Sequence, residues 1–194
     1  DDGKKDAENK QKVENALAKL PGSRNATVTV KGDTLTITNF KAEIPYAGMG
    51  TNVITLDELK AEGVDFDAAT KAGVVPVAKK VTFKNYRSTM DMKDTGLGGA
   101  GAVSGTVAGM EFANLQLDAA AMDKSLDKDA PVKDLVAAML TFKADSSAMQ
   151  NYRADLNMGF VSGSFAMDKA STGAFSVLGC KDMVAENFKA VFLG

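Results

Sequence analysis

A short run centred on asparagine occurs five times in this sequence, and the alternation of apolar residues changes phase at each one. In the clearest copy, Leu35 and Ile37 precede the asparagine at odd positions. After Asn39 the apolar residues stand at even positions, Phe40 and Ala42. Because strand side chains point alternately to the two faces of a sheet, this pattern predicts a long strand with one irregular residue. The five asparagines are Asn39, Asn85, Asn114, Asn151 and Asn187.

The irregular residue is best interpreted as a β-bulge, one extra residue that shifts the side-chain alternation by one position. Asparagine suits such a position because it tolerates the left-handed backbone conformation and hydrogen-bonds to nearby backbone groups. Bulged strands twist and bend more than regular ones. Five bulges in register therefore predict a strongly bent antiparallel sheet, a half-barrel or trough whose strands change their inward face at each asparagine.

Three stretches have helical patterns. Apolar residues at helical spacing from Val13 to Leu20 predict an N-terminal helix within residues 1–22. A capping-box pattern that begins at Thr55 predicts short helices over residues 56–72. An apolar stripe after Pro131 predicts a further helix over residues 131–140. The expected fold is α+β and mainly β, with three or four short helices packed on the bent sheet.

The order of these patterns repeats along the chain. Each half runs from one asparagine copy through a helical insertion to a second copy, and then into a glycine-bearing hairpin. We therefore expect residues 23–194 to form a single β-rich domain with an internal duplication, divided into about residues 23–113 and 114–194.

The residue types limit the chemistry. The chain has no histidine and a single cysteine, Cys180. Nucleophilic catalysis by cysteine or serine lacks its usual base, and a zinc site lacks its usual ligands. Residues 96–101 match a dinucleotide-binding glycine pattern, but strand-like residues follow them, so we expect a loop. We predict no catalytic residues, no metal and no cofactor; a hydrolase that uses acidic residues and a structural module of a larger assembly are the alternatives.

Methionine is abundant in the predicted strands, with ten in the chain and no tryptophan. Its flexible side chain adapts to irregular apolar partners. These residues either fill a core or form a surface for an apolar ligand. The candidate ligand contacts are Met90, Met92, Met110, Phe112, Met158 and Phe160.

Cations recur two residues after four of the asparagines, on the face opposite the apolar row. This slot predicts a basic stripe along the sheet. The stripe is either a solvated face or the rim of a groove, where it would meet lipid head groups or a polyanion. The four residues are Lys41, Arg87, Arg153 and Lys189.

The run from Leu35 to Phe40, with its partner copies, resembles the recurring Leu-x-Leu-x-Asn-Leu units of large bacterial envelope proteins of the AsmA type. The resemblance covers the five motif runs and implies repeated β-units that form a lipid-accommodating groove.

We therefore expect a non-enzymatic bacterial envelope or periplasmic protein that binds an apolar or amphipathic ligand, such as a lipid, or a protein partner. The chain starts at Asp1 rather than methionine, which we interpret as removal of a signal peptide and hence a periplasmic or extracytoplasmic location. A net charge of −2 gives no reason to expect nucleic acid, and no apolar run predicts a transmembrane helix.

Overall fold

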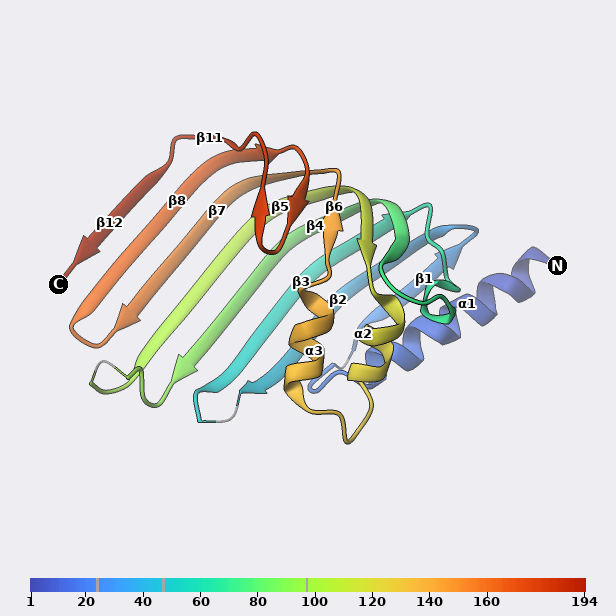
Figure 1. Ribbon diagram of the computed structural model, residues 1–194, viewed down its shortest axis with the longest axis horizontal. Coiled ribbons are helices and arrows are strands. Elements are labelled where there is room, and N and C mark those ends of the chain that lie inside the picture. Colours follow the sequence, from blue (N-terminus) through green and yellow to red (C-terminus); the bar gives the residue numbers. More distant parts are fainter. Residues whose placement is uncertain (24, 47, 97) are drawn as a thin grey trace.

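The computed structural model describes residues 1–23, 25–46, 48–96 and 98–194. Within these ranges the protein is mainly β, a 12-stranded antiparallel sheet with three α-helices (Figure 1). The strands are β1 (Thr27–Lys31), β2 (Thr34–Tyr46), β3 (Gly50–Glu62), β4 (Val75–Met92), β5 (Gly101–Leu117), β6 (Lys143–Ala144), β7 (Ser146–Met158), β8 (Val161–Thr172), β9 (Phe175–Ser176), β10 (Gly179–Cys180), β11 (Val184–Glu186) and β12 (Lys189–Leu193). The helices are α1 (Asp2–Ala18), α2 (Ala119–Ser125) and α3 (Val132–Met139), and a 3-10 turn η1 spans Ala68–Thr70.

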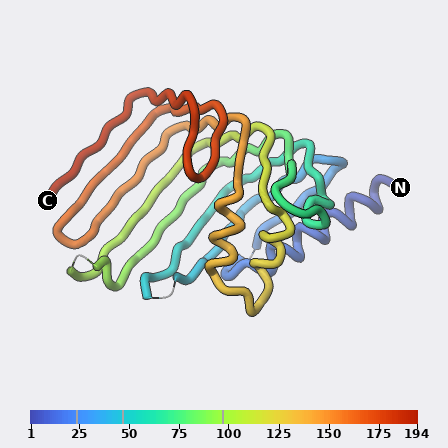
Figure 2. Tube along the Cα trace, viewed as in Figure 1, coloured from blue at the N-terminus to red at the C-terminus, as the bar shows by residue number. Residues whose placement is uncertain are grey.

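The long strands lie next to one another in the order β1, β2, β3, β4, β5, β7, β8, and β11 and β12 then both pair with β8. The short strands β6, β9 and β10 branch from the end of β5. Figure 2 shows the long strands as one open array, with the helices gathered at the N-terminal end and the C-terminus at the opposite margin. None of the helices in the described ranges is both long and apolar enough to cross a bilayer.

The five motif asparagines all adopt the predicted left-handed conformation, with φ between 51° and 56°. The predicted bulges are nevertheless absent at these positions, because no extra residue is inserted. Thr38 pairs with Glu58 and Phe40 pairs with Leu56, so Asn39 lies directly opposite a single residue of β3. Register is equally continuous past the other four asparagines; the long described strands shift register between Pro76 and Ala78.

The change of phase does not exchange the two faces of the sheet. Ile37 lies before Asn39 and Phe40 after it, yet both pack in the same core cluster. The left-handed residue therefore directs two consecutive side chains, Thr38 and Asn39, to the outer face and then restores the apolar row on the inner face. The sheet stays open and is not strongly curled, so the predicted strong bend into a half-barrel is wrong. The sheet lacks that bend because no strand has an extra residue at its asparagine. Neighbouring strands stay paired one to one and change phase along a common line.

That common line runs across the sheet, and we call it the asparagine line. Its members lie directly opposite one another on adjacent strands: Asn39, Asp57, Asn85, Ala108, Asn151, Asp168 and Asn187. Strands β3, β5 and β8 change phase there without an asparagine. On β3 the apolar residues Leu56 and Leu59 are consequently three residues apart, which imitates a helix. The helix predicted over 56–62 is therefore wrong, and its capping-box pattern lies within a strand.

Two of the three α-helices in the described ranges were predicted, and they differ from expectation at their ends. Helix α1 includes the polar residues before Val13, and Val13 and Leu17 pack against the core of β1–β5. Helix α3 confirms the stripe after Pro131. Helix α2 was not predicted; Asp118 caps it by accepting a hydrogen bond from the Ala121 amide at 2.9 Å. The strand order does not show a duplicated unit, so the division at about residues 23–113 and 114–194 stays a prediction.

Candidate functional site

The inner face of the sheet, which carries the apolar row, is covered by helices over only part of its width. Figure 1 shows α2 and α3 in front of the strands near β2 and β3, while β7, β8 and β12 have no helix in front of them. The core under the helices is well buried, with Val81 and Leu56 both at 5 % exposure or less. Beyond the helices, Phe188 and Phe192 remain 58 % and 60 % exposed. We call the region over β5, β7, β8 and β12 the open inner face.

Three cross-strand rows of side chains build the open inner face. The row next to the asparagine line is large and partly aromatic, with Tyr86, Val107, Tyr152 and Met167. The next row contains the small residues Ser88, Gly105 and Ala154, followed by Phe165 and Ala190. The third row is again large, with Met90, Val103 and Leu156, then Gly163 and Phe192. The small residues thus form a low strip between two higher apolar rows.

An apolar cavity of about 400 Å³ lies between α2, α3 and the sheet. Its lining is Tyr46, Leu117, Met122, Val136, Ala138, Met139, Leu140, Phe142, Phe175 and Val177. Tyr46 also begins a cross-strand row that continues through Gly50, Met92 and Gly101. The cavity therefore adjoins the strands that carry the open inner face. Apolar cavities with few polar groups are the usual sites of small-molecule binding.

The predicted ligand residues divide into two groups. Met90 and Met158 lie on the inner face of β4 and β7, and Phe160 lies 68 % exposed in the turn between β7 and β8. Met92 and Phe112 are buried instead.

Phe112 packs with three other rings and belongs to the core. Its ring centroid lies 6.0 Å from that of Phe83, 5.1 Å from Phe142 and 5.8 Å from Phe175. Met110 on β5 lies directly opposite Phe83 on β4, next to this group of rings.

The cavity lining from α3 was not predicted from the sequence, because the helical stripe of α3 looked like ordinary core packing.

The predicted cations share one cross-strand row on the outer face. Threonines and an alanine separate them, in the order Lys41, Thr55, Arg87, Thr106, Arg153, Ala166, Lys189. Alternate strands place successive cations roughly 10 Å apart. Because the row faces away from the open inner face, it is not a rim of that surface.

Neighbouring carboxylates pair with two of these cations. Lys41 lies 3.3 Å from Glu43, and Arg153 lies 3.2 Å from Asp168. Arg87 has no ion pair with any residue in the described ranges. Arg87 and Arg153 both line a hollow of about 570 Å³ on the outer face, together with Thr106 and Ala108.

Asp168 joins three strands at the asparagine line. Its carboxylate accepts hydrogen bonds from the Asn187 side chain at 2.8 Å and from Arg153 at 3.2 Å. The hydrogen bond from Asn187 has the largest effect and that from Arg153 the next largest, and both lower the pKa of Asp168 below its usual value of 3.8. The Asn85 side chain donates in the same way to Asp57 at 2.8 Å. Pairs of this kind hold neighbouring strands in register.

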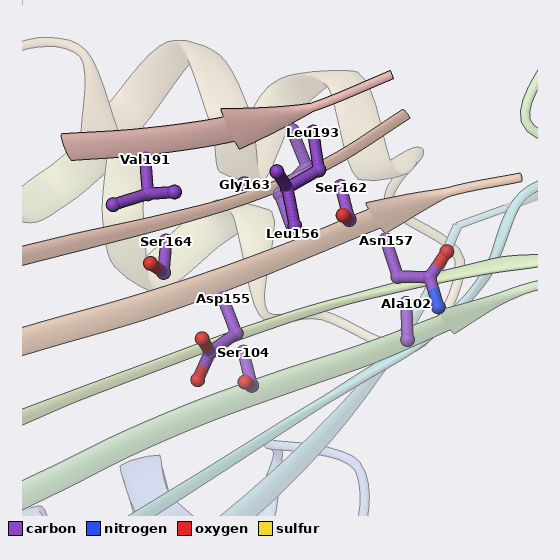
Figure 3. A pocket seen from close by; sticks show the side chains of 10 residues that line it. All are labelled: Ala102, Ser104, Asp155, Leu156, Asn157, Ser162, Gly163, Ser164, Val191 and Leu193. Atoms are coloured by element: carbon purple, nitrogen blue, oxygen red, sulfur yellow. The ribbon is translucent and has the colours of Figure 1, made fainter. Parts of the chain in front are cut away.

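A second outer-face hollow, of about 330 Å³, lies near the C-terminal edge (Figure 3). Ser104, Asp155 and Ser164 line it together with Val191 and Leu193. Asp155 is exposed and makes no hydrogen bond to either serine within the described residues. This arrangement does not form the paired nucleophile and base that acyl transfer requires.

No family model, curated protein or solved structure matches this chain.

Proposed function

We propose that this protein is a non-enzymatic binding protein for an amphipathic molecule such as a lipid, whose acyl chain occupies the apolar cavity and extends over the open inner face. The observation that carries the proposal is the cavity under α3, which is lined almost wholly by apolar side chains. Filling it with an acyl chain would remove apolar surface from water, at about 25 cal/mol per Å² of area buried.

The open inner face supports the same ligand. Val107 and Met167 are buried on this face, whereas Val103, Phe188 and Phe192 leave apolar surface exposed. Exposed apolar surface that lies together on a protein is often an interaction site. The low strip at Ser88, Gly105 and Ala154 gives an extended chain a place between two higher rows. Met90 and Met158 add flexible side chains that adapt to a flexible ligand.

The proposed location is the bacterial envelope, outside the cytoplasm. It rests on the likeness of the asparagine runs to the repeated units of AsmA-type proteins, which also suggests a lipid rather than another apolar compound. The outer-face cations lie on the opposite side of the sheet, so they have no part in holding the acyl chain.

Helix α3 offers a matched pair of variants to test the proposal. Val136 lines the cavity, whereas Val132 lies on the same helix outside it, and the two are 39 % and 42 % exposed. We expect Val136→Asp to weaken binding of a fluorescent fatty acid at least tenfold, because it places a carboxylate in the apolar cavity. Val132→Asp should bind as the unchanged protein does. Thermal unfolding of both variants checks that they are folded. Equal affinities for the two variants, or no saturable binding by the unchanged protein, would overturn the proposal.

A further inference from the structure

The two edges of the sheet differ in how they are covered. Helix α1 lies against β1, where Asp6 accepts a hydrogen bond from the Gly32 amide at 3.0 Å. Val13 and Leu17 of α1 pack on the cluster that contains Val28. At the other edge, β11 and β12 pair with β8, and no other described segment pairs with them. All residues from 179 to 194 are exposed.

Strand β12 presents large apolar side chains on both faces. Phe192 extends the inner face, as does Phe188 just before the strand, and Phe192 packs on Phe165 with ring centroids 5.2 Å apart. Val191 and Leu193 point to the outer face, where they border the hollow in Figure 3. Natural sheets usually protect an edge with charges, proline, a bulge or a covering element. Within the described residues, β12 has a lysine at its start and none of the other devices.

The asparagine line indicates which kind of strand fits beside β12. Left-handed asparagines occupy the line on β2, β4, β7 and the β11–β12 segment. The strands between them carry Asp57, Ala108 or Asp168, and these three residues are not left-handed. Asn85 and Asn151 each lie between two strands of this second kind. Asn187 has such a neighbour on one side, in β8.

We propose that the β11–β12 edge binds an extended segment of another protein, which adds to the sheet as an antiparallel strand. Edge strands recognise peptides in this way through backbone hydrogen bonds, with side-chain pockets adding specificity. The fitting segment alternates apolar and polar residues and changes phase once. Opposite Asn187 it carries a small or acidic residue, as Ala108 and Asp168 are placed opposite the asparagines beside them.

A second copy of this chain fits this edge less well than a foreign segment does. Its own β12 would bring two left-handed asparagine strands together, whereas the two kinds alternate in the rest of the sheet. Its β1 edge lies against α1 and has five residues, fewer than the β11–β12 segment. The partner is therefore a strand whose residue on the asparagine line is not left-handed, like those of β3, β5 and β8.

Strand β8 supplies a probe, since it already pairs with two asparagine strands. We would use a labelled peptide with the sequence of residues 161–172, and a control peptide that lacks only the residue corresponding to Lys169. In the control, the apolar residues alternate without a change of phase. When it pairs with the edge, its apolar side chains therefore face the inner side before Asn187 and the outer side after it, or the reverse. Fluorescence anisotropy with the full chain measures both affinities, and hydrogen exchange locates the bound peptide.

We expect the first peptide to bind at least tenfold more tightly than the control and to protect amides of residues 184–193. Protection should not extend to β1. Equal affinities, absence of binding, or protection at another site would overturn the proposal. Concentration-dependent dimers that protect residues 184–193 without peptide would also overturn it, in favour of a second copy. The peptide is measured without fatty acid, so failure here is distinguishable from failure of the cavity test, to whose lining β12 contributes no residue.

Discussion

Strands β2–β4 on one side and β7, β8 and the β11–β12 segment on the other share the asparagine line and the same apolar patterning, but they differ in what covers them. Under the helices, the patterned residues make a closed core with Val28, Ile37 and Val81. Beyond the helices, the equivalent positions on β12 face solvent. Apolar periodicity therefore marks which face of a strand is suited to burial, while burial itself depends on whether a second layer is present.

The largest expected difference between the closed core and the open C-terminal edge is the cost of removing a phenylalanine ring. Phe112 is 7 % exposed and touches three rings, so Phe112→Ala should lower the free energy of unfolding by about 3–5 kcal/mol. Phe192→Ala removes the same atoms from an exposed side chain, so it should lower the free energy of unfolding by less than about 1 kcal/mol. Urea unfolding measures both. Similar losses would mean that the open inner face is covered in solution.

The asparagine line should behave alike in both halves, because its backbone geometry is the same. Asn85 and Asn151 have φ of 54° and 53°. Alanine in this conformation is strained by roughly 1–2 kcal/mol, and glycine is not. We expect Asn→Gly to be more stable than Asn→Ala by about 1 kcal/mol at each site, measured by chemical unfolding. A glycine advantage confined to Asn85 would show that the line is held only where helices support it.

Acid should loosen the C-terminal edge through Asp168. A folded-state pKa lowered below 3.8 means that the carboxylate stabilises the fold at pH values above 3.8. This contribution is lost as the pH falls through the folded-state pKa. We expect amide exchange in residues 184–193 to accelerate there relative to β1, after correction for intrinsic exchange. Asp168→Asn supplies the control, and an unchanged acid response in that variant would assign the effect to other groups.

The smallest effect is expected from Arg87, which lies on the outer face without an ion pair in the described part of the chain. Arg87→Ala should change the free energy of unfolding by less than about 0.5 kcal/mol. Fatty-acid affinity should stay within twofold, because the acyl chain is proposed to lie on the other face. A tenfold loss of affinity would show that the ligand also reaches the outer-face cations.

Much of the local structure could be predicted from the sequence. The asparagines mark left-handed residues because few other residue types tolerate that conformation, and all five were found there. Long strands such as β2 and β4 follow from period-two alternation on either side. Strand β3 was mistaken for a helix because its phase changes at Asp57, where no left-handed asparagine signals the break.

The candidate site was less accessible to such reasoning. Met90 and Phe112 have similar surroundings in the sequence, yet one lies on the inner face next to the open region and the other is enclosed by three rings. What separates them is the position of α2, α3 and the β9–β10 hairpin, which the strand pattern does not specify. The cavity depends on α3 lying near Tyr46, a contact between residues distant in the chain.

By itself, the sequence determined where the backbone turns left-handed, which side chains alternate and which residues could support chemistry, since these are properties of single residues and their near neighbours. Only the tertiary structure decided that the five asparagine strands keep one inner face, that four of the asparagines share one line while Asn114 lies off it, and that part of the inner face is left open. Those features depend on register between strands and on the placement of a second layer, which are set by packing over long sequence separations.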